Sequence, residues 1–292
     1  MAKILFPDEF RWGAQSSAFQ IEGAPEEAGR SPSIWDKFCA SPGRIKDQSN
    51  AERTTEHWVH WEHDLDLMKR IGLRAYNFSV AWSRILPNGF GTPNDAGLDF
   101  YDRLVDGLLL RGIDPWLTLN HWDLPLVVED KGGWLRRDTI YHFADYAQKV
   151  SERLGDRVQN WITHSDPYAM AFLGYKEGTH APGETKARDG WIAAHHLLLS
   201  HAEASEALKA EARMSDTQVG IALHLIPASP ASHSDADHRA TIQFDGEQNR
   251  WFLDPLYKGE YPDDIFFKAK ADSGTLGTDW IQRGDLQRIH KS

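Results

Sequence analysis

Ala75-Tyr-Asn-Phe-Ser-Val80 is the stretch that decides the fold of this chain, because its aromatic and β-branched residues are typical of a buried strand. Residues 97–111 follow it with apolar residues at helical spacing, and residues 114–120 form a second strand candidate. A strand, a helix and another strand in this order predict two parallel strands joined by a right-handed crossover. The chain is therefore expected to be an α/β protein.

The same alternation runs from residue 10 to residue 225. Further strand candidates are residues 10–15, 159–163 and 218–225. Further helical patterns are residues 64–72, 138–154 and 191–212, with Asp138 and Gly155 suited to the start and stop of the second. Residues 228–236 are rich in Ser, Pro, Ala and Asp, and are expected to form a loop. Since no linker composition marks a boundary, a single domain is expected over residues 1–292.

Composition narrows the class of protein. The chain is 41% hydrophobic and 26% charged, as is usual for globular proteins, and its net charge of -11 argues against binding to nucleic acid or anionic membranes. No apolar run approaches the roughly 20 residues that span a bilayer, and the N-terminus does not resemble a signal peptide. We therefore expect a cytoplasmic protein. Cys39 is the only cysteine, which excludes an intrachain disulfide.

Polar residues gather after the predicted strands. His121 and Trp122 follow the third strand candidate, Ser165 and Asp166 follow the fourth, and His224 ends the fifth. In parallel α/β barrels the chemistry is concentrated at the carboxyl ends of the strands. These five side chains are therefore candidates for one functional site.

Several longer motifs carry a specific resemblance. They are Phe10-Arg-Trp-Gly-Ala14, Gln20 with Glu22-Gly23, Phe78-Ser-Val-Ala-Trp-Ser-Arg84, Gly97-Leu-Asp-Phe-Tyr101, His121-Trp-Asp-Leu-Pro125, Gly132-Gly-Trp134, Ala181-Pro-Gly183 and Trp251-Phe-Leu-Asp-Pro255. The chain resembles glycoside hydrolase family 1, the β-glucosidase family, from Phe6 to about Ile289. Thr163-His-Ser-Asp-Pro167 stands where that family has Thr-x-Asn-Glu-Pro.

The resemblance implies a fold and a chemistry. The fold is a TIM-type (β/α)8 barrel, and the reaction is hydrolysis of β-glycosides with retention of configuration through two carboxyl groups about 5 Å apart. Gln20, His121 and Trp122 would bind the sugar, together with Ser165 at the place of the family's Asn. Asp166 would hold the place of the acid/base Glu. No cofactor is implied.

The chain also departs from the family pattern in length. It holds no Thr-Glu-Asn-Gly motif, which in the family carries the nucleophile on strand seven, and it matches only the first five β/α units. Five strands cannot close an eight-stranded barrel, so we expect an incomplete barrel with open sheet edges. A homo-oligomer or a complementing chain is expected to cover these edges.

Further departures fall at the strand ends. Asn77 replaces Arg, Ser165 replaces Asn, Asp166 replaces Glu and His224 replaces Asn. Because Asp is one methylene shorter than Glu, a β-glucosidase-like protein with impaired or absent activity is expected. The alternative for Asp166 is a carboxylate that stands before Pro167 and caps the following turn.

Two other functions remain open at this point. His121, Asp166 and His224 could bind a divalent metal, with His164 nearby, and support a metal-dependent enzyme. A non-catalytic sugar-binding protein or partner subunit is the second alternative.

The remaining histidines are assigned structural roles. His57, His60 and His63 are expected at a helix surface and pocket edge. A second group on a long helix is expected to make polar contacts in the core: His195, His196 and His201.

Overall fold

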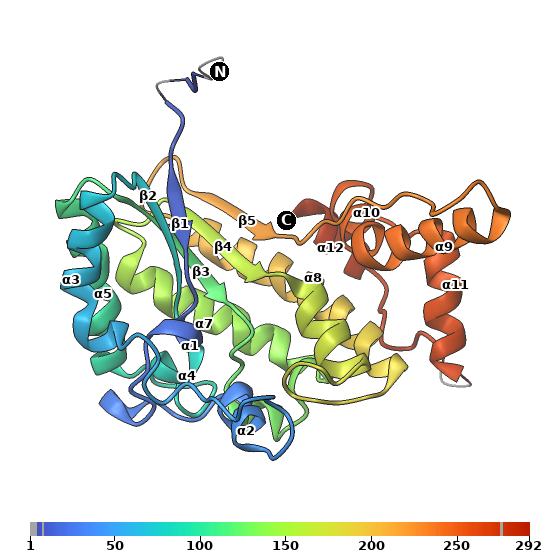
Figure 1. Ribbon diagram of the computed structural model, residues 1–292, viewed down its shortest axis with the longest axis horizontal. Helices are drawn as coiled ribbons and strands as arrows, with labels where there is room; N and C mark the ends of the chain where they lie inside the picture. The colour runs from blue at the N-terminus through green and yellow to red at the C-terminus, as the bar shows by residue number, and fades with distance from the viewer. Residues whose placement is uncertain (1–4, 8, 275–276) are drawn as a thin grey trace.

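The computed structural model describes residues 5–7, 9–274 and 277–292. Its centre is a five-stranded sheet whose strands lie in chain order (Figure 1). The strands are β1 (Gly13–Gln15), β2 (Ala75–Ser79), β3 (Asp114–Asn120), β4 (Asn160–Ser165) and β5 (Gln218–Ala222). Because every neighbouring pair is parallel, all the carboxyl ends lie at one end of the sheet.

Four long helices connect the strands and pack successively against one another (Figure 1). They are α3 (His57–Arg70), α5 (Asp95–Leu110), α7 (Asp138–Leu154) and α8 (Ala187–Ala210). Helix α5 contacts β3, and α8 contacts both β4 and β5. The predicted α/β class with parallel strands is confirmed.

The two faces of the sheet differ in burial. Tyr76 and Phe78 of β2 are buried, as period-two alternation requires of a face that packs on helices. Asn77 lies between them on the other face and is only half-buried. Trp116, in register with Asn77, keeps 37% of its surface exposed. The second face is therefore more open than the helix-covered one.

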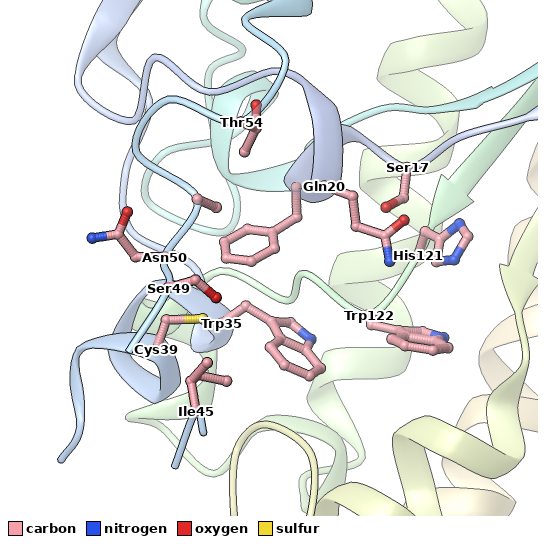
Figure 2. Close-up of a pocket in the computed structure, with 12 residues that line it drawn as sticks. Ser17, Gln20, Trp35, Cys39, Ile45, Ser49, Asn50, Thr54, His121 and Trp122 are labelled. Carbon is pink, nitrogen blue, oxygen red and sulfur yellow. The ribbon is translucent and has the colours of Figure 1, made fainter. Parts of the chain in front are cut away.

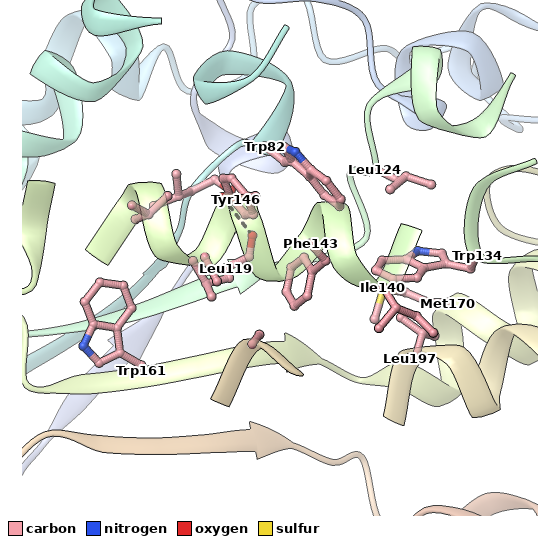
Figure 3. Close-up of a cluster of buried hydrophobic side chains, with 14 of the residues drawn as sticks. Trp82, Leu119, Leu124, Trp134, Ile140, Phe143, Tyr146, Trp161, Met170 and Leu197 are labelled. Carbon is pink, nitrogen blue, oxygen red and sulfur yellow. Dashed lines mark hydrogen bonds between the residues drawn. The ribbon is translucent and has the colours of Figure 1, made fainter. Parts of the chain in front are cut away.

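Large aromatic side chains fill the space between the sheet and the helices (Figure 3). Trp82 stacks on Tyr146 with ring centroids 5.0 Å apart, and Phe143 packs against both rings. The buried Tyr146 hydroxyl donates toward two strand-end carbonyls, those of Val80 (3.0 Å) and Leu119 (3.1 Å). Helix α7 is thereby tied to the carboxyl ends of β2 and β3.

A buried ion pair anchors the segment after β1. Glu22 accepts hydrogen bonds from Arg84 Nε at 3.2 Å and from the Tyr101 hydroxyl at 2.6 Å. Gly97 lets α5 approach this point, because a Cβ there would lie 2.5 Å from the Arg84 carbonyl oxygen. Motifs that stood apart in the sequence thus meet in one packed cluster.

Shorter helices complete the fold. Those before β5 are α1 (Ala18–Ile21), η1 (Glu27–Gly29), α2 (Ile34–Ala40), α4 (Trp82–Ile85), α6 (Leu126–Glu129), η2 (Gly133–Leu135) and η3 (Ala169–Lys176). Those after β5 are α9 (Asp235–Asp245), η4 (Gly246–Arg250), α10 (Trp251–Tyr257), α11 (Asp263–Asp272) and α12 (Asp285–Lys291). Both α11 and α12 pack on α8.

The expected loop at residues 228–236 is correct only in its first part, because α9 begins at Asp235. Ser234 caps this helix by accepting a hydrogen bond from the Asp237 amide at 3.1 Å. Strand β5 ends at Ala222, two residues before His224. Within the described residues, no helix combines the length and the apolar character needed to cross a membrane.

Candidate functional site

A cavity of about 420 Å³ lies at the carboxyl ends of the strands. Its lining residues are Gln15, Ser16, Gln20, His121, Trp122, Ser165, Asp166, Ala222, Leu223 and His224. We call it the main cavity. It brings together the side chains that the sequence predicts for sugar binding and proton transfer, which are Gln20, His121, Trp122, Ser165 and Asp166. His224 lines the same cavity.

His121 and Trp122 enter the main cavity directly after β3. Trp122 adopts a left-handed backbone conformation (φ 77°), which is uncommon for a residue other than glycine and concentrates at functional sites. Its indole Nε1 donates to the Ser165 carbonyl at 2.9 Å, which fixes the ring beside β4.

The His121 imidazole is partly buried and offers an unsatisfied nitrogen. Burial lowers its pKa to about 4, so the ring is neutral at pH 7 and carries one donor and one acceptor. Its Nδ1 is buried and finds no hydrogen-bond partner among the residues that the structure describes. Leaving a buried nitrogen of this kind without a partner costs about 1–3 kcal/mol.

Asp166 is held by both neighbouring segments. Its amide donates to the Ala222 carbonyl of β5 at 2.8 Å, and its φ of 51° is again left-handed. Its Oδ1 accepts a hydrogen bond from the Ala169 amide at 3.1 Å, and its Oδ2 lies 3.2 Å from His224 Nδ1. The predicted capping of the following turn is therefore confirmed.

Ser165 and Gln20 reach the main cavity from different directions. Ser165 is nearly buried at the end of β4, where the register with β5 is irregular between Ile162 and Ser165. Gln20 lies on α1, whose start is fixed by a 2.7 Å hydrogen bond from the Ala18 amide to Ser79 Oγ. Gln20 therefore sits above the sheet with its carboxamide exposed.

A second cavity, of about 240 Å³, adjoins the main cavity (Figure 2). The two share Gln20, His121 and Trp122, and in Figure 2 the Gln20 carboxamide is directed toward His121. The second cavity adds aromatic, aliphatic and small polar side chains, which are Ser17, Phe19, Trp35, Cys39, Ile45, Ser49, Asn50, Ala51 and Thr54. Cys39 lies on α2, and its pKa is raised mainly by burial and to a smaller extent by the charge of Asp36.

An aromatic wall borders both cavities. The rings of Trp35 and Trp122 stack with centroids 6.3 Å apart, and His180 contacts both edge-on. Sequence reasoning missed Trp35 and His180. Trp35 lies on α2, and the capping box of Ser33 and Asp36 at the start of this helix could have predicted the helix from the sequence.

Asn77 does not line the main cavity. Its side-chain oxygen accepts a 2.8 Å hydrogen bond from the Thr118 hydroxyl on β3. The family resemblance implies an arginine at position 77. This chain has the neutral Asn77 there, and its side chain is hydrogen-bonded to the neighbouring strand.

The metal hypothesis is wrong for the described residues, where no group of three or more His, Cys, Asp or Glu side chains is placed to hold an ion. Asp166 and His224 are adjacent, but His121 does not join them as a third ligand. His164 is no spare ligand either, because it is buried and bonded to Asn120 Nδ2 (3.0 Å) and Ser200 Oγ (2.9 Å).

The other histidines divide between core and surface. The expectation for His57 is wrong, since it is buried with its Nδ1 2.6 Å from Asp64, whereas His60 and His63 are exposed on α3 as expected. The predicted core contacts on α8 are confirmed. Their partners are Tyr261 and Asp285 for His195, the Trp134 carbonyl for His196, and Thr163 for His201.

Comparisons with known sequences agree with the motif reading. The sequence model of glycosyl hydrolase family 1 matches residues 2–292. β-Glucosidase A of Acetivibrio thermocellus is 44% identical over 274 residues, which cover 93% of this chain and 60% of that protein. A β-glucosidase of an Agrobacterium species is 45% identical over 257 residues, which cover 88% and 56%. The chain therefore spans about 56–60% of the length of these relatives.

Solved structures agree as well. The family 1 β-glucosidase of Exiguobacterium antarcticum B7 superposes with a TM-score of 0.94 at 41% identity, covering 98% of this chain and 64% of that one. The Thermotoga maritima family 1 β-glucosidase in complex with isofagomine lactam gives 0.93 at 36%, covering 98% and 64%. The virulence factor SghA of Agrobacterium tumefaciens, solved with the substrate analogue salicin, gives 0.92 at 42%, covering 97% and 61%. The five-stranded sheet agrees with the predicted first five units of a TIM-type barrel.

Proposed function

Because the chain belongs to glycosyl hydrolase family 1, we propose that residues 1–292 form the part of a β-glucosidase-type site that binds the sugar ring of a β-glucoside. The observation that carries the proposal is the main cavity itself, which is lined by Gln20, His121, Trp122, Ser165 and Asp166. They come from α1 and from the ends of β3 and β4, so the fold gathers them from three separate parts of the sequence.

Each side chain suits a sugar. The neutral His121 ring carries one donor and one acceptor, and the Gln20 carboxamide beside it offers two donors and an acceptor. Ser165 adds a hydroxyl at the other wall of the cavity. The Trp122 indole provides an apolar face, fixed by its bond to the Ser165 carbonyl, on which the C–H groups of a pyranose can pack.

Asp166 occupies the acid/base position and is poorly placed to serve as the proton donor. Its carboxyl group is one carbon–carbon bond, about 1.5 Å, shorter than that of Glu. Both oxygens already have partners, Ala169 and His224. General acid catalysis contributes about 10²–10⁴-fold and requires hydrogen-bond reach, so we propose that little of this contribution remains in the Asp166 carboxyl itself.

We further propose that residues 1–292 alone bind β-glucosides but turn them over little or not at all. The sequence holds no Thr-Glu-Asn-Gly stretch, which the family resemblance associates with the nucleophile. Double displacement needs both carboxyl groups.

Calorimetric titration tests the binding, with salicin and isofagomine lactam as probes because they are ligands of structurally similar proteins. Gln20→Ala and His121→Ala should each weaken binding by about tenfold, as expected for one lost hydrogen bond. Gln243→Ala is the matched control, because this carboxamide is exposed on α9 outside the cavity. Equal affinity in all four proteins would refute the proposed site.

Hydrolysis of nitrophenyl β-glucosides tests the catalytic statement. The chain is expected to release nitrophenol no faster than buffer at neutral pH. Turnover that Asp166→Ala abolishes would contradict the impaired state and assign full glycosidase activity to these residues.

The sheet edges provide a reason to propose an assembly partner. The residues of β1 are exposed, as is Gln218 of β5, and the apolar rings of Phe6, Phe10 and Trp12 cluster beside β1 in the open. Open strand edges pair readily with other chains, so we propose that a second copy or a complementing chain covers them. Light scattering after gel filtration tests this, and a monomer that unfolds cooperatively would contradict it.

A further inference from the structure

We propose that Asp166 and His224 form a proton-transfer pair, in which the His224 imidazole, oriented by Asp166, gives and takes the proton at the bound sugar. This role rests on the proposed function, because the group that receives the proton is the glycosidic oxygen of a β-glucoside in the main cavity. Asp166 then acts as a positioning residue.

Each oxygen of the Asp166 carboxyl group has a hydrogen-bond partner. The Ala169 amide donates to Oδ1, and His224 Nδ1 lies at hydrogen-bond distance from Oδ2. The Asp166 side chain is only 15% exposed, whereas that of His224 is 60% exposed. The carboxyl group is thus the fixed inner member of the pair, and the imidazole is the outer member that reaches the cavity.

The backbone beneath His224 is also fixed. The buried Gln248 donates from Nε2 to the His224 carbonyl at 2.8 Å. Asn249 bonds Ile226 twice, accepting from its amide at 2.9 Å and donating to its carbonyl at 2.8 Å. Two consecutive carboxamides of η4 therefore fix the segment after β5 that carries the imidazole.

This geometry decides which nitrogen exchanges its proton. Because a carboxylate only accepts, Nδ1 must donate, and Nε2 is left as the nitrogen that gains and loses a proton. In the forward step, Nε2–H of the imidazolium transfers its proton to the glycosidic oxygen, and the electrons of the breaking C–O bond remain on that oxygen. The anomeric carbon accepts an electron pair from a carboxylate nucleophile supplied by the chain that completes the site, and neutral imidazole remains.

Other titratable groups face the pair, and burial is the main cause of the shift in the pKa of each. Burial lowers the pKa of His121 to about 4 and also lowers that of His180 below its usual range. Burial raises the pKa of Tyr168 to about 12, with Glu177 and Glu247 acting in the same direction. The pH dependence is therefore tested by comparing the wild type with a variant of His224.

Nitrogen-15 NMR of the histidine-labelled chain tests the orientation without requiring turnover. The neutral His224 ring should be the Nδ1–H tautomer in the wild type. In Asp166→Asn, the amide oxygen can still accept from Ala169, so the NH₂ group faces His224 and Nδ1 must accept instead. The tautomer should then change to Nε2–H. An unchanged tautomer would overturn the pairing, and since the capping hydrogen bond is kept, misfolding would not explain that result.

The pH dependence of salicin affinity tests the proton itself. Binding should be about tenfold tighter when His224 is protonated, as for one charge-assisted hydrogen bond. His224→Gln should bind with pH-independent affinity, and His60→Gln, exposed on α3, should behave as the wild type. Binding without pH dependence would refute the proton role and leave the proposed function standing. Absence of salicin binding in every variant would refute the proposed function, whereas the tautomer would still decide the orientation of His224.

Discussion

Acid should destabilise the native state through histidines that are buried neutral, and His201 offers the clearest measurement. Its ring lies on α8, nearly fully buried, with Nδ1 2.8 Å from the Thr163 hydroxyl of β4. Burial, and then the charge of Lys209, lowers its pKa from 6.5 to about 4. Replacement by Gln removes the titrating ring and retains hydrogen-bonding groups.

The magnitude follows from linkage. As pH falls below about 6.5, His201 takes up a proton in the unfolded chain but not in the native state, so native stability is lost. The loss is complete below about pH 4 and amounts to about 3 kcal/mol, at about 1.4 kcal/mol for each unit between the two pKa values. By pH 5.5 it has reached about 1 kcal/mol.

Urea unfolding followed by tryptophan fluorescence measures this loss at pH 7.5 and 5.5. The free energy of unfolding should fall by about 1 kcal/mol more in the wild type than in His201→Gln, because the other buried groups titrate equally in both. His60→Gln is the control, since solvent reaches this imidazole on α3 in the native state. Parallel losses in the wild type and His201→Gln would refute the reasoning.

Three other outcomes are expected from the geometry. Tyr146→Phe removes the donor shared by the Val80 and Leu119 carbonyls and should cost about 1–3 kcal/mol in urea unfolding; an unchanged midpoint would show that the hydroxyl does not stabilise this junction. Glu22→Gln leaves the buried Arg84 cation without its counter-charge and should cost about 3–5 kcal/mol in the same assay, and a loss below 1 kcal/mol would contradict the burial of this pair. Zinc in excess should leave the melting temperature unchanged, since the described residues contain no metal-ligand group; stoichiometric retention after dialysis would contradict this.

The sequence predicts the fold well where one face of an element is buried. The prediction for residues 114–120 coincides with β3, which is a short and largely buried strand. The prediction for residues 138–154 coincides with α7, which buries one face at helical spacing. It gives no warning of the helices after β5. Helix α10 is only 7 residues long and contains Pro255. Helix α9 has no buried residue, so neither helix shows a clear hydrophobic periodicity in the sequence.

The residues of the site could be nominated from the sequence, but not their orientation. Motif and strand order placed Asp166 and His224 at neighbouring strand ends. The direction of the Asp166 carboxyl group depends on its left-handed φ and on the irregular register before it, and both arise from packing between β4 and β5. The free Nδ1 of His121 is likewise a property of burial, which the sequence does not encode locally.

Asp166 and His224 at the neighbouring strand ends depend on each other for their positions. With Asp at position 166, the shortened carboxyl group stops beside the turn that it caps, and an imidazole at position 224 can bond to its other oxygen. A longer carboxyl group at 166 would extend into the space between the two side chains and compete with that imidazole. A side chain without a donor at 224 would leave Oδ2 of Asp166 without the bond that orients it. Each residue therefore helps to hold the other in place at the edge of the main cavity.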